Sequence, residues 1–230
     1  MADTMTEPIP EYVLFDMDNT LYDFYFAKTQ SCEAVVNFAG SGDGMELFRY
    51  FMSGTHGFED HNNIHDFLED KGIFEPPRLY EDACAVYEEV KLASLKLYPG
   101  VKETLKMLAD AGVPMAIITD AESSQAEKRL ATTGVRDYFD GVMTPDRSGV
   151  RKPKPEIFHA AAGMLKCNVH EAWIVGDSPK REIEPGNLLG MTTVYAKYGD
   201  WIGIPYPKIR PDYTLQSFGG DLQEIMHLKK

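Results

Sequence analysis

The chain has 230 residues, of which 43% are hydrophobic and 26% are charged, and its formal net charge is -13. This composition is ordinary for a globular protein, and the length is sufficient for one large core with a smaller inserted domain. The negative charge argues against nucleic acid polymers and anionic membranes as partners, because no basic field attracts phosphate groups, so an anionic ligand must be held by local groups.

The first predicted element is a buried strand over residues 12–16, with the sequence YVLFD. Side chains alternate along a strand, so Asp16 and Asp18 are expected to point to the same side at its carboxyl end. Like charges repel, and a site that keeps two carboxylates together usually holds a cation, a shared proton or a reaction that needs both. Backbone N–H groups in the following turn, up to Asn19, are candidates for holding phosphate oxygens.

Residues 22–97 contain no further strand of this kind, and their patterns predict helices over 27–38, 45–51, 64–69 and 79–95. We interpret them as a helical domain inserted into a core formed by residues 1–21 and 98–230. Tyr22 begins an aromatic cluster directly after the first polar motif. Core packing is the default role of such a cluster, and its position makes Tyr22 a candidate for the substrate pocket.

Short apolar runs recur at residues 114–120, 139–144, 172–177 and 192–196, separated by helical patterns at 105–109, 125–133 and 156–165. Runs without alternation are typical of strands buried on both faces. The alternation of strands and helices predicts an α/β fold with a parallel sheet covered on both faces. The proline-rich C-terminal stretch is expected to wrap the core, add an edge strand at 213–215 and end in a helix over 220–230.

Polar residues gather where these strands end, and ligands bind parallel sheets at that edge. Carboxylate oxygens such as those of Asp16 and Asp177 are ligands that magnesium prefers, and a carboxylate can also attack phosphorus. Lys152 supplies a positive charge and Thr119 a hydroxyl donor that would offset the charge of a bound phosphate. Asp120 is interpreted as a helix cap and, like Asn19, is a candidate contact to the substrate.

Four motifs carry a family resemblance: DMDNTL, IIT, RKPKPEIF and WIVGDSPKREI. In order and in strand context they resemble the motifs of the haloacid dehalogenase-like (HAD) phosphohydrolases. The resemblance implies a Rossmann-like three-layer α/β/α core with Mg²⁺, and residues 22–97 are similar to the family's helical C1 cap. It also implies that Asp16 is the nucleophile, that Asp18 is the general acid and base, and that Thr119 and Lys152 hold the phosphoryl group.

The fourth motif departs from the family pattern at one of the expected magnesium ligands. The resemblance gives these ligands as Asp16, the main-chain carbonyl of Asp18, Asp177 and residue 182. The family usually has aspartate at this last position, whereas this chain has Glu182. Glutamate keeps the charge but moves it outward by a methylene group, so Glu182 is expected to bind the metal directly, through water or from outside its ligand shell.

The expected activity is magnesium-dependent hydrolysis of a small phosphorylated metabolite through an aspartyl-phosphate intermediate. The alternatives are a phosphomutase, which keeps both aspartates, a 2-haloacid dehalogenase, which does not need Asp18, and a regulatory module without catalysis. The DNTLY sequence is similar to some nucleotidases of the superfamily, but nothing in residues 22–97 specifies the substrate. The chain is expected to be a monomer or a homodimer.

The remaining features indicate a cytoplasmic protein. Cys32, Cys84 and Cys167 lie far apart in the sequence and are expected to be reduced, buried thiols. The first residues lack the pattern of a signal peptide, and no apolar stretch approaches the roughly 20 residues of a membrane span. His61 and His65 have the spacing of a helical metal pair, but we interpret them as surface or packing residues because no third ligand follows.

Overall fold

The computed structural model describes residues 9–73 and 78–228. The contacts within the chain separate two compact units. The first, Met1–Asp23 with Leu97–Lys230, is called the core unit here, and the second, Phe24–Lys96, is called the helical unit. Tyr22 and Leu97, at the two crossings between the units, pair with each other in an isolated β-bridge and belong to the core unit.

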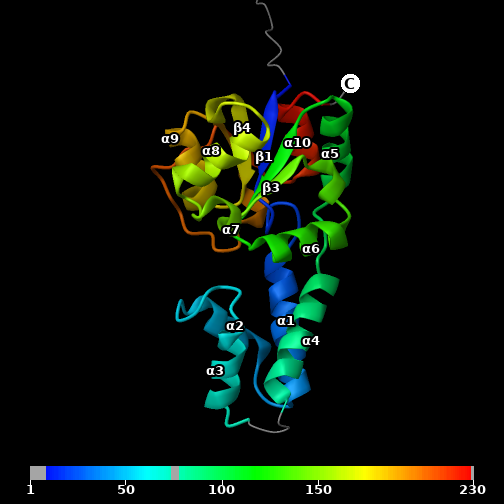
Figure 1. Cartoon of the computed structure of the whole chain (residues 1–230), viewed down its shortest axis with the longest axis vertical. Helices are drawn as coiled ribbons and strands as arrows, with labels where there is room; N and C mark the ends of the chain where they lie inside the picture. Colours follow the sequence, from blue (N-terminus) through cyan, green and yellow to red (C-terminus); the bar gives the residue numbers. More distant parts are fainter. Residues whose placement is uncertain (1–8, 74–77, 229–230) are drawn as a thin grey trace, which may run out of the picture. The chain divides into compact units, whose positions relative to one another are not determined.

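A parallel sheet forms the centre of the core unit (Figure 1). Within the described residues it has six strands in the order β3-β2-β1-β4-β5-β6. Their bounds are β1 Tyr12–Phe15, β2 Met115–Ile118, β3 Gly141–Met143, β4 Ala172–Gly176, β5 Thr192–Ala196 and β6 Tyr213–Leu215. The predicted strands are confirmed, and β6 lies at the edge as expected. Because β1 lies in the middle and every pair is parallel, residues that follow β1, β2 and β4 meet at one edge.

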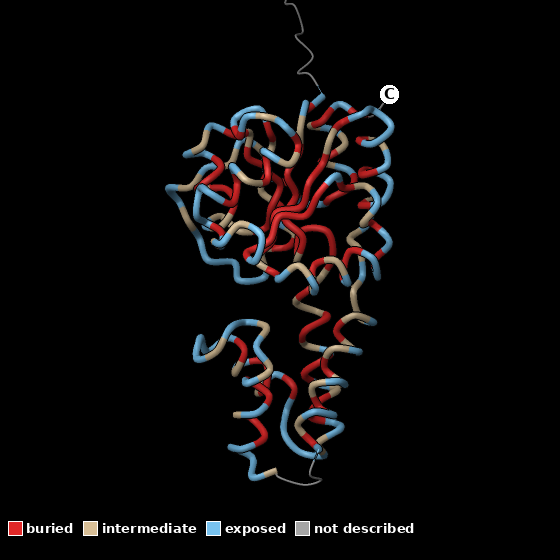
Figure 2. The backbone as a smooth tube through the Cα atoms, viewed as in Figure 1, coloured by how far each residue is buried: buried red, intermediate tan, exposed pale blue. Residues whose placement is uncertain are grey.

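Helices cover both faces of this sheet, so the predicted three-layer α/β/α architecture is confirmed. The burial pattern explains the layers: Leu14 belongs to the apolar cluster that contains Phe158 of α8, whereas Phe15 packs against Phe218 on the opposite face. Figure 2 shows the strands as the buried centre of this unit. The helices of the core unit are α5 Val101–Asp110, α6 Ser123–Thr133, α7 Pro145–Ser148, α8 Pro155–Met164, α9 Glu184–Leu188 and α10 Gly219–Ile225.

The C-terminal helix is shorter than predicted. It was expected over residues 220–230, but α10 spans Gly219–Ile225, and residues 229–230 lie outside the described residues. His227 has a φ of 51°, in the left-handed region that does not continue an α-helix. The apolar spacing of Leu222, Met226 and Leu228 is typical of a longer helix. All three side chains are buried, but Met226 and Leu228 follow the end of α10.

The helical unit contains α1 Phe24–Ala39, α2 Gly44–Met52, α3 Asn62–Asp70 and α4 Leu79–Ala93 in its described part. It has an apolar cluster of its own that includes Val35, Phe67 and Tyr87. Two lysines are buried inside it: Lys28 lies over the rings of aromatic residues and donates to the Phe58 carbonyl, and Lys91 donates to Glu88 at 2.6 Å. A unit with its own apolar core can pack independently of the sheet.

The prediction of buried thiols holds for one of the three cysteines. Within the described ranges Cys32, Cys84 and Cys167 are all free thiols, but only Cys32 is buried, whereas Cys84 and Cys167 are partly exposed. His61 and His65 have different neighbours: His61 Nε2 lies 2.9 Å from Glu88 Oε1, whereas the ligand atoms of His65, Asp66 and Glu69 lie within 4.8 Å of one another. Hydrogen bonds with Cys84 and Glu88 raise the pKa of His61 to about 9. Among the residues that the structure describes, no helix has the length and apolar character needed to cross a membrane.

Candidate active site

Asp16 occupies the point where β1 ends in the middle of the sheet. The side chain is almost fully buried, and both of its carboxylate oxygens accept hydrogen bonds: Oδ2 from the Thr20 hydroxyl at 2.9 Å and Oδ1 from the Lys152 ammonium. The chain turns sharply after Asp16, with Asn19 in the left-handed region at a φ of 60°. Asparagine tolerates this conformation better than most residues, so the turn that surrounds Asp16 is specified locally.

Lys152 reaches the same place from the segment that precedes α8. Its side chain is fully buried, with Nζ bonded to Asp16, 2.7 Å from Glu182 Oε1 and 3.2 Å from the Ile118 carbonyl. Burial alone would lower the pKa of Lys152, but the carboxylates of Asp16 and Glu182 outweigh it and raise the pKa above its ordinary value. The lysine is therefore a permanent cation beside Asp16.

A π-helical turn, η3 Pro179–Ile183, places Glu182 beneath the end of β4. Glu182 is fully buried, and its Oε2 accepts a hydrogen bond of 2.9 Å from the backbone N–H of Ser178. Gly176 makes room for it, because a Cβ there would lie 2.4 Å from Glu182 Cγ. The longer side chain is thus folded back into the site rather than directed outward.

Asp16, Asp177 and Glu182 fit a magnesium ion. Each offers a carboxylate oxygen, and the three oxygens lie within 4.8 Å of one another. Asp177 Oδ1 is buried and accepts no hydrogen bond from the described residues. Burial and the charges of Asp16 and Glu182 raise the pKa of Asp177 well above its ordinary value, and burial likewise raises that of Glu182. A hard cation would relieve this repulsion, and carboxylate oxygens are its preferred ligands.

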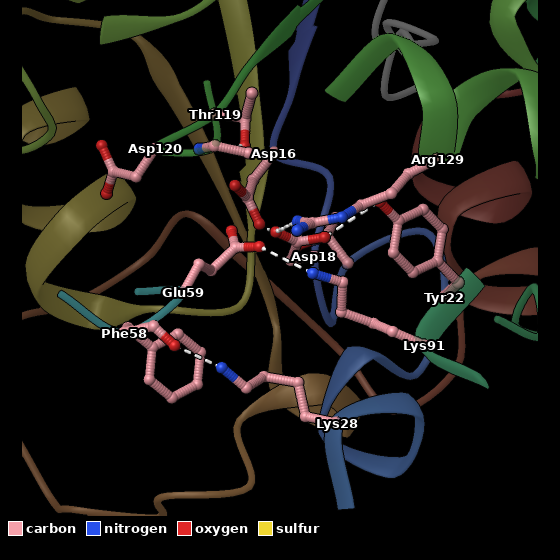
Figure 3. A network of polar contacts seen from close by, with 12 residues as sticks. Asp16, Asp18, Tyr22, Lys28, Phe58, Glu59, Lys91, Thr119, Asp120 and Arg129 are labelled. Carbon is pink, nitrogen blue, oxygen red and sulfur yellow. Dashed lines mark hydrogen bonds and ion pairs between the residues drawn. The ribbon is translucent and has the colours of Figure 1, made fainter. Parts of the chain in front are cut away.

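Asp18, two residues after Asp16, is held by two further side chains of the core unit (Figure 3). Its Oδ1 accepts a hydrogen bond of 2.9 Å from the Tyr22 hydroxyl, and its Oδ2 lies 2.7 Å from Nη1 of Arg129 on α6. Tyr22 and Arg129 are both fully buried, whereas 19% of the Asp18 side chain is exposed. Asp18 is therefore fixed on one side and accessible on the other.

Comparisons with known proteins place this arrangement in a family. The model of the haloacid dehalogenase-like hydrolases matches residues 10–190, which include all of the side chains described above. The chain belongs to this family. It is 29% identical to a glyceraldehyde 3-phosphate phosphatase of Methanocaldococcus jannaschii, over 95% of this chain and 98% of that protein.

A further relative and a solved structure also resemble this HAD hydrolase. A glyceraldehyde 3-phosphate phosphatase of Methanopyrus kandleri is 31% identical over 82% of this chain and 84% of its own length. A HAD hydrolase of Bacillus subtilis, solved with bound magnesium, has a similar fold with a TM-score of 0.73 at 21% identity, covering 95% of this chain and 99% of that one. The HAD hydrolase described here is thus an enzyme whose named relatives include phosphatases.

The other residues singled out in the sequence of this HAD hydrolase lie around the same edge, in different roles. Thr119 is buried at the end of β2, where its hydroxyl accepts from the Ala121 N–H at 3.1 Å. The prediction that Asp120 caps a helix is wrong, because α6 begins at Ser123 with Glu122 as its N-cap. Asp120 Oδ1 instead accepts from the backbone N–H of Lys152 at 2.9 Å and so anchors the lysine segment.

Sequence reasoning missed Arg129, although a signal was present. The buried residues of α6 are Ala126, Arg129, Leu130 and Thr133, which form one stripe at helical spacing. An arginine on the apolar stripe of an amphipathic helix has to find a charged or polar partner inside the protein. That requirement points to a carboxylate close to the interior, and Asp18 fulfils it.

The turn after β5, η4 Lys197–Gly199, was missed as well and supports the loop that carries Asp18. The Tyr198 hydroxyl donates to the Thr20 carbonyl at 2.7 Å. Gly199 lies so close to this loop that a Cβ would be 1.7 Å from the Asn19 carbonyl oxygen. Only glycine permits this approach of two backbone segments.

Gly199→Ala is therefore expected to displace the loop around Asp16 and to lower both stability and activity. Because the clash is with backbone atoms, the loss of unfolding free energy is expected at about 3 kcal/mol, the upper end for overpacking. Gly163→Ala is the matched control, since Gly163 lies in α8 with no atom within 4 Å of an added Cβ. Thermal melts and turnover of both variants check this, and a Gly199→Ala variant that behaves like Gly163→Ala contradicts it.

Proposed function

We propose that this HAD hydrolase is a magnesium-dependent phosphomonoesterase that acts through an aspartyl-phosphate intermediate. The observation that carries the proposal is the arrangement around Asp16. A buried carboxylate lies against a buried ammonium group, Lys152, and beside two further carboxylates, Asp177 and Glu182, that fit a divalent cation. This arrangement combines a nucleophile with positive charge for the phosphoryl oxygens.

In the first step, a carboxylate oxygen of Asp16 attacks phosphorus, a new P–O bond forms, and the bond to the leaving oxygen breaks with its electron pair. Asp18, in its protonated form, donates a proton to the leaving oxygen, so that an alcohol departs. Lys152 and the Thr119 hydroxyl offset the negative charge on the phosphoryl oxygens. Magnesium, held by Asp16, the main-chain carbonyl of Asp18, Asp177 and Glu182, would supply further positive charge to those oxygens.

In the second step, water attacks the phosphorus of the aspartyl phosphate and Asp18 takes up its proton. The P–O bond to Asp16 breaks, the carboxylate of Asp16 is restored, and inorganic phosphate leaves. Asp18 is protonated again and ready for the next leaving group. The two steps need one group that both gives and accepts a proton, and Asp18 is a partly exposed carboxylate two residues from the nucleophile.

We also propose that the helical unit is a C1 cap that restricts the substrate to small phosphate esters. Its separate apolar core supports this role, because a cap has to keep its shape while it moves. Two relatives are named as phosphatases of glyceraldehyde 3-phosphate, so three-carbon phosphate esters are the first candidates. Nucleoside monophosphates follow, because the DNTLY sequence resembles that of some nucleotidases of the superfamily.

A screen of phosphorylated metabolites tests the proposed function. Purified protein should release inorganic phosphate in the presence of Mg²⁺, lose this activity with a chelator and regain it when Mg²⁺ is returned in excess. Phosphate transfer to an added sugar phosphate in place of water would identify a phosphomutase. Halide release from a 2-haloacid would identify a dehalogenase. If the protein catalyses none of these reactions on any compound tested, that result would support a module without catalysis.

Glu182 is expected to set the magnesium requirement. Glu182→Ala removes the charge and the bond to Ser178 N–H, so the Mg²⁺ concentration for half-maximal activity should rise by about 10- to 100-fold. Glu182→Gln keeps an oxygen that can accept the hydrogen bond from Ser178 N–H but removes the charge. It therefore distinguishes the effect of the charge from the effect of this hydrogen bond. Glu182→Asp keeps the charge and introduces the residue that is usual in the family, so it should be tolerated best.

Magnesium titrations at fixed ionic strength distinguish these three variants. Glu184→Gln is the matched control, because Glu184 lies two residues away and pairs with Lys180 at the surface. Glu182→Ala and Glu184→Gln titrating alike would show that Glu182 only shapes the turn.

A further inference from the structure

Arg129 is joined to the reacting part of the site through an ion pair with Asp18. Its guanidinium Nη1 lies 2.7 Å from Asp18 Oδ2, and its own side chain has no exposed surface. A side chain without exposed surface does not contact a substrate directly, so any influence of Arg129 on the reaction has to act through a neighbour. That neighbour, Asp18, is 19% exposed and can reach a bound ester.

We propose that Arg129, together with Tyr22, is a positioning clamp that fixes the direction of the Asp18 carboxyl group for proton transfer. The inference rests on the proposed function, in which Asp18 is the general acid and base. Each of the two clamp residues takes a different oxygen of Asp18, Tyr22 on Oδ1 and Arg129 on Oδ2, as Figure 3 shows.

Two anchors on two oxygens determine the rotation of the carboxyl plane, which one anchor would leave free. The exposed part of the Asp18 side chain, 19% of its surface, is where a leaving oxygen or a water molecule can approach. Arg129 comes from α6, 111 residues along the chain from Asp18, and the stripe of α6 that includes it is buried in the core unit. The clamp therefore connects the loop after β1 to a helix of the core unit, and proton transfer needs a carboxyl group held in one orientation.

A double-substitution cycle tests whether Arg129 acts through Asp18. Arg129→Met, Asp18→Asn and the double variant are compared by the release of the first equivalent of phenol from unsubstituted phenyl phosphate, whose leaving oxygen carries no electron-withdrawing substituent on the ring. Arg129→Met alone should slow this release, whereas on the Asp18→Asn background it should change the rate by no more than about 2-fold. If Arg129→Met slows both backgrounds equally, Arg129 acts independently of Asp18 and the proposal is overturned.

The leaving group supplies a second readout. An alkyl phosphate needs a proton on its departing oxygen, while an aryl phosphate with electron-withdrawing groups does not. We expect Arg129→Met to lower kcat/KM by about 10- to 100-fold for alkyl esters and much less for activated aryl esters. Tyr22→Phe should show the same pattern to a smaller degree. A uniform loss over all esters, in step with thermal stability, would indicate a purely structural role.

Arg136→Met is the matched control, because Arg136 also forms an ion pair near α6, with Glu127 at 2.6 Å, but does not contact Asp18. If Arg129→Met does not fold, Arg129→Lys takes its place: it keeps the charge on a shorter, single donor and should give a smaller loss with the same dependence on the leaving group. A parent enzyme that hydrolyses no ester refutes the proposed function. A parent that does so, with variants insensitive to the leaving group, refutes the clamp alone.

Discussion

The Asp16→Asn variant is expected to lose at least about 10³-fold in turnover while it keeps the native fold. An amide does not attack phosphorus, so the aspartyl phosphate does not form. The structure explains why the fold should survive. The amide oxygen can keep the hydrogen bond from Lys152, and its NH₂ group can donate to the Thr20 hydroxyl, which accepts as readily as it donates.

Turnover and thermal melting of Asp16→Asn, freshly purified and checked by mass spectrometry for deamidation, decide this prediction. Asp137→Asn provides the control, since it makes the same change at an exposed position in η1 Arg136–Tyr138. Steady turnover by Asp16→Asn near the parent rate would refute the assignment of the nucleophile. A loss of activity accompanied by unfolding would show that Asp16 mainly stabilises the site.

The sequence predicted the carboxylates of the site because their placement follows from short-range patterns. Asp16 and Asp177 each end a continuous apolar run, and such runs are strands buried on both faces. The ends of β1 and β4 meet because the two strands are parallel and Phe15, the last residue of β1, lies opposite Val175 of β4. Local sequence together with the rules of parallel sheets was therefore enough to predict which residues lie near Asp16.

Contacts between distant segments were not predictable in the same way. Gly199 approaches Asn19, and Asp120 binds the backbone of Lys152 rather than capping α6. Both contacts depend on how a loop from one strand packs against a loop from another, and no periodic pattern encodes that packing. The π-helical turn that returns Glu182 to the site is another example, because the family resemblance alone left the direction of its longer side chain open.

Lys152→Met should have the second large effect, because it removes the cation from a buried group of three carboxylates. The thioether side chain has a similar length, so packing is largely kept while the charge is lost. Removing one partner of a buried ion pair costs about 3–5 kcal/mol. Turnover should also fall by about 10²- to 10³-fold, since Lys152 would no longer offset charge on the phosphoryl oxygens.

Lys154→Met makes the same change two residues away, at an exposed position that precedes α8, and should leave both properties close to those of the parent. Comparison of the two variants by thermal melts and phosphate release separates the effect of the buried charge from the chemistry of the substitution. Equal behaviour of the two would show that Lys152 is not needed in the site.

Magnesium gives this comparison a readout that does not depend on turnover. Without Lys152, the oxygens of Asp16, Asp177 and Glu182 would repel one another with no neighbouring ammonium group, so a divalent cation gains attraction and loses a competing charge. Binding to the folded state raises stability in proportion to the logarithm of ligand concentration over Kd. Added Mg²⁺ is therefore expected to raise the Tm of Lys152→Met by more than it raises the Tm of the parent or of Lys154→Met. If Mg²⁺ raises the Tm of Lys152→Met by less than it raises the Tm of the parent, removal of the lysine charge has not strengthened metal binding. That result would contradict a shared metal site formed by the three carboxylates.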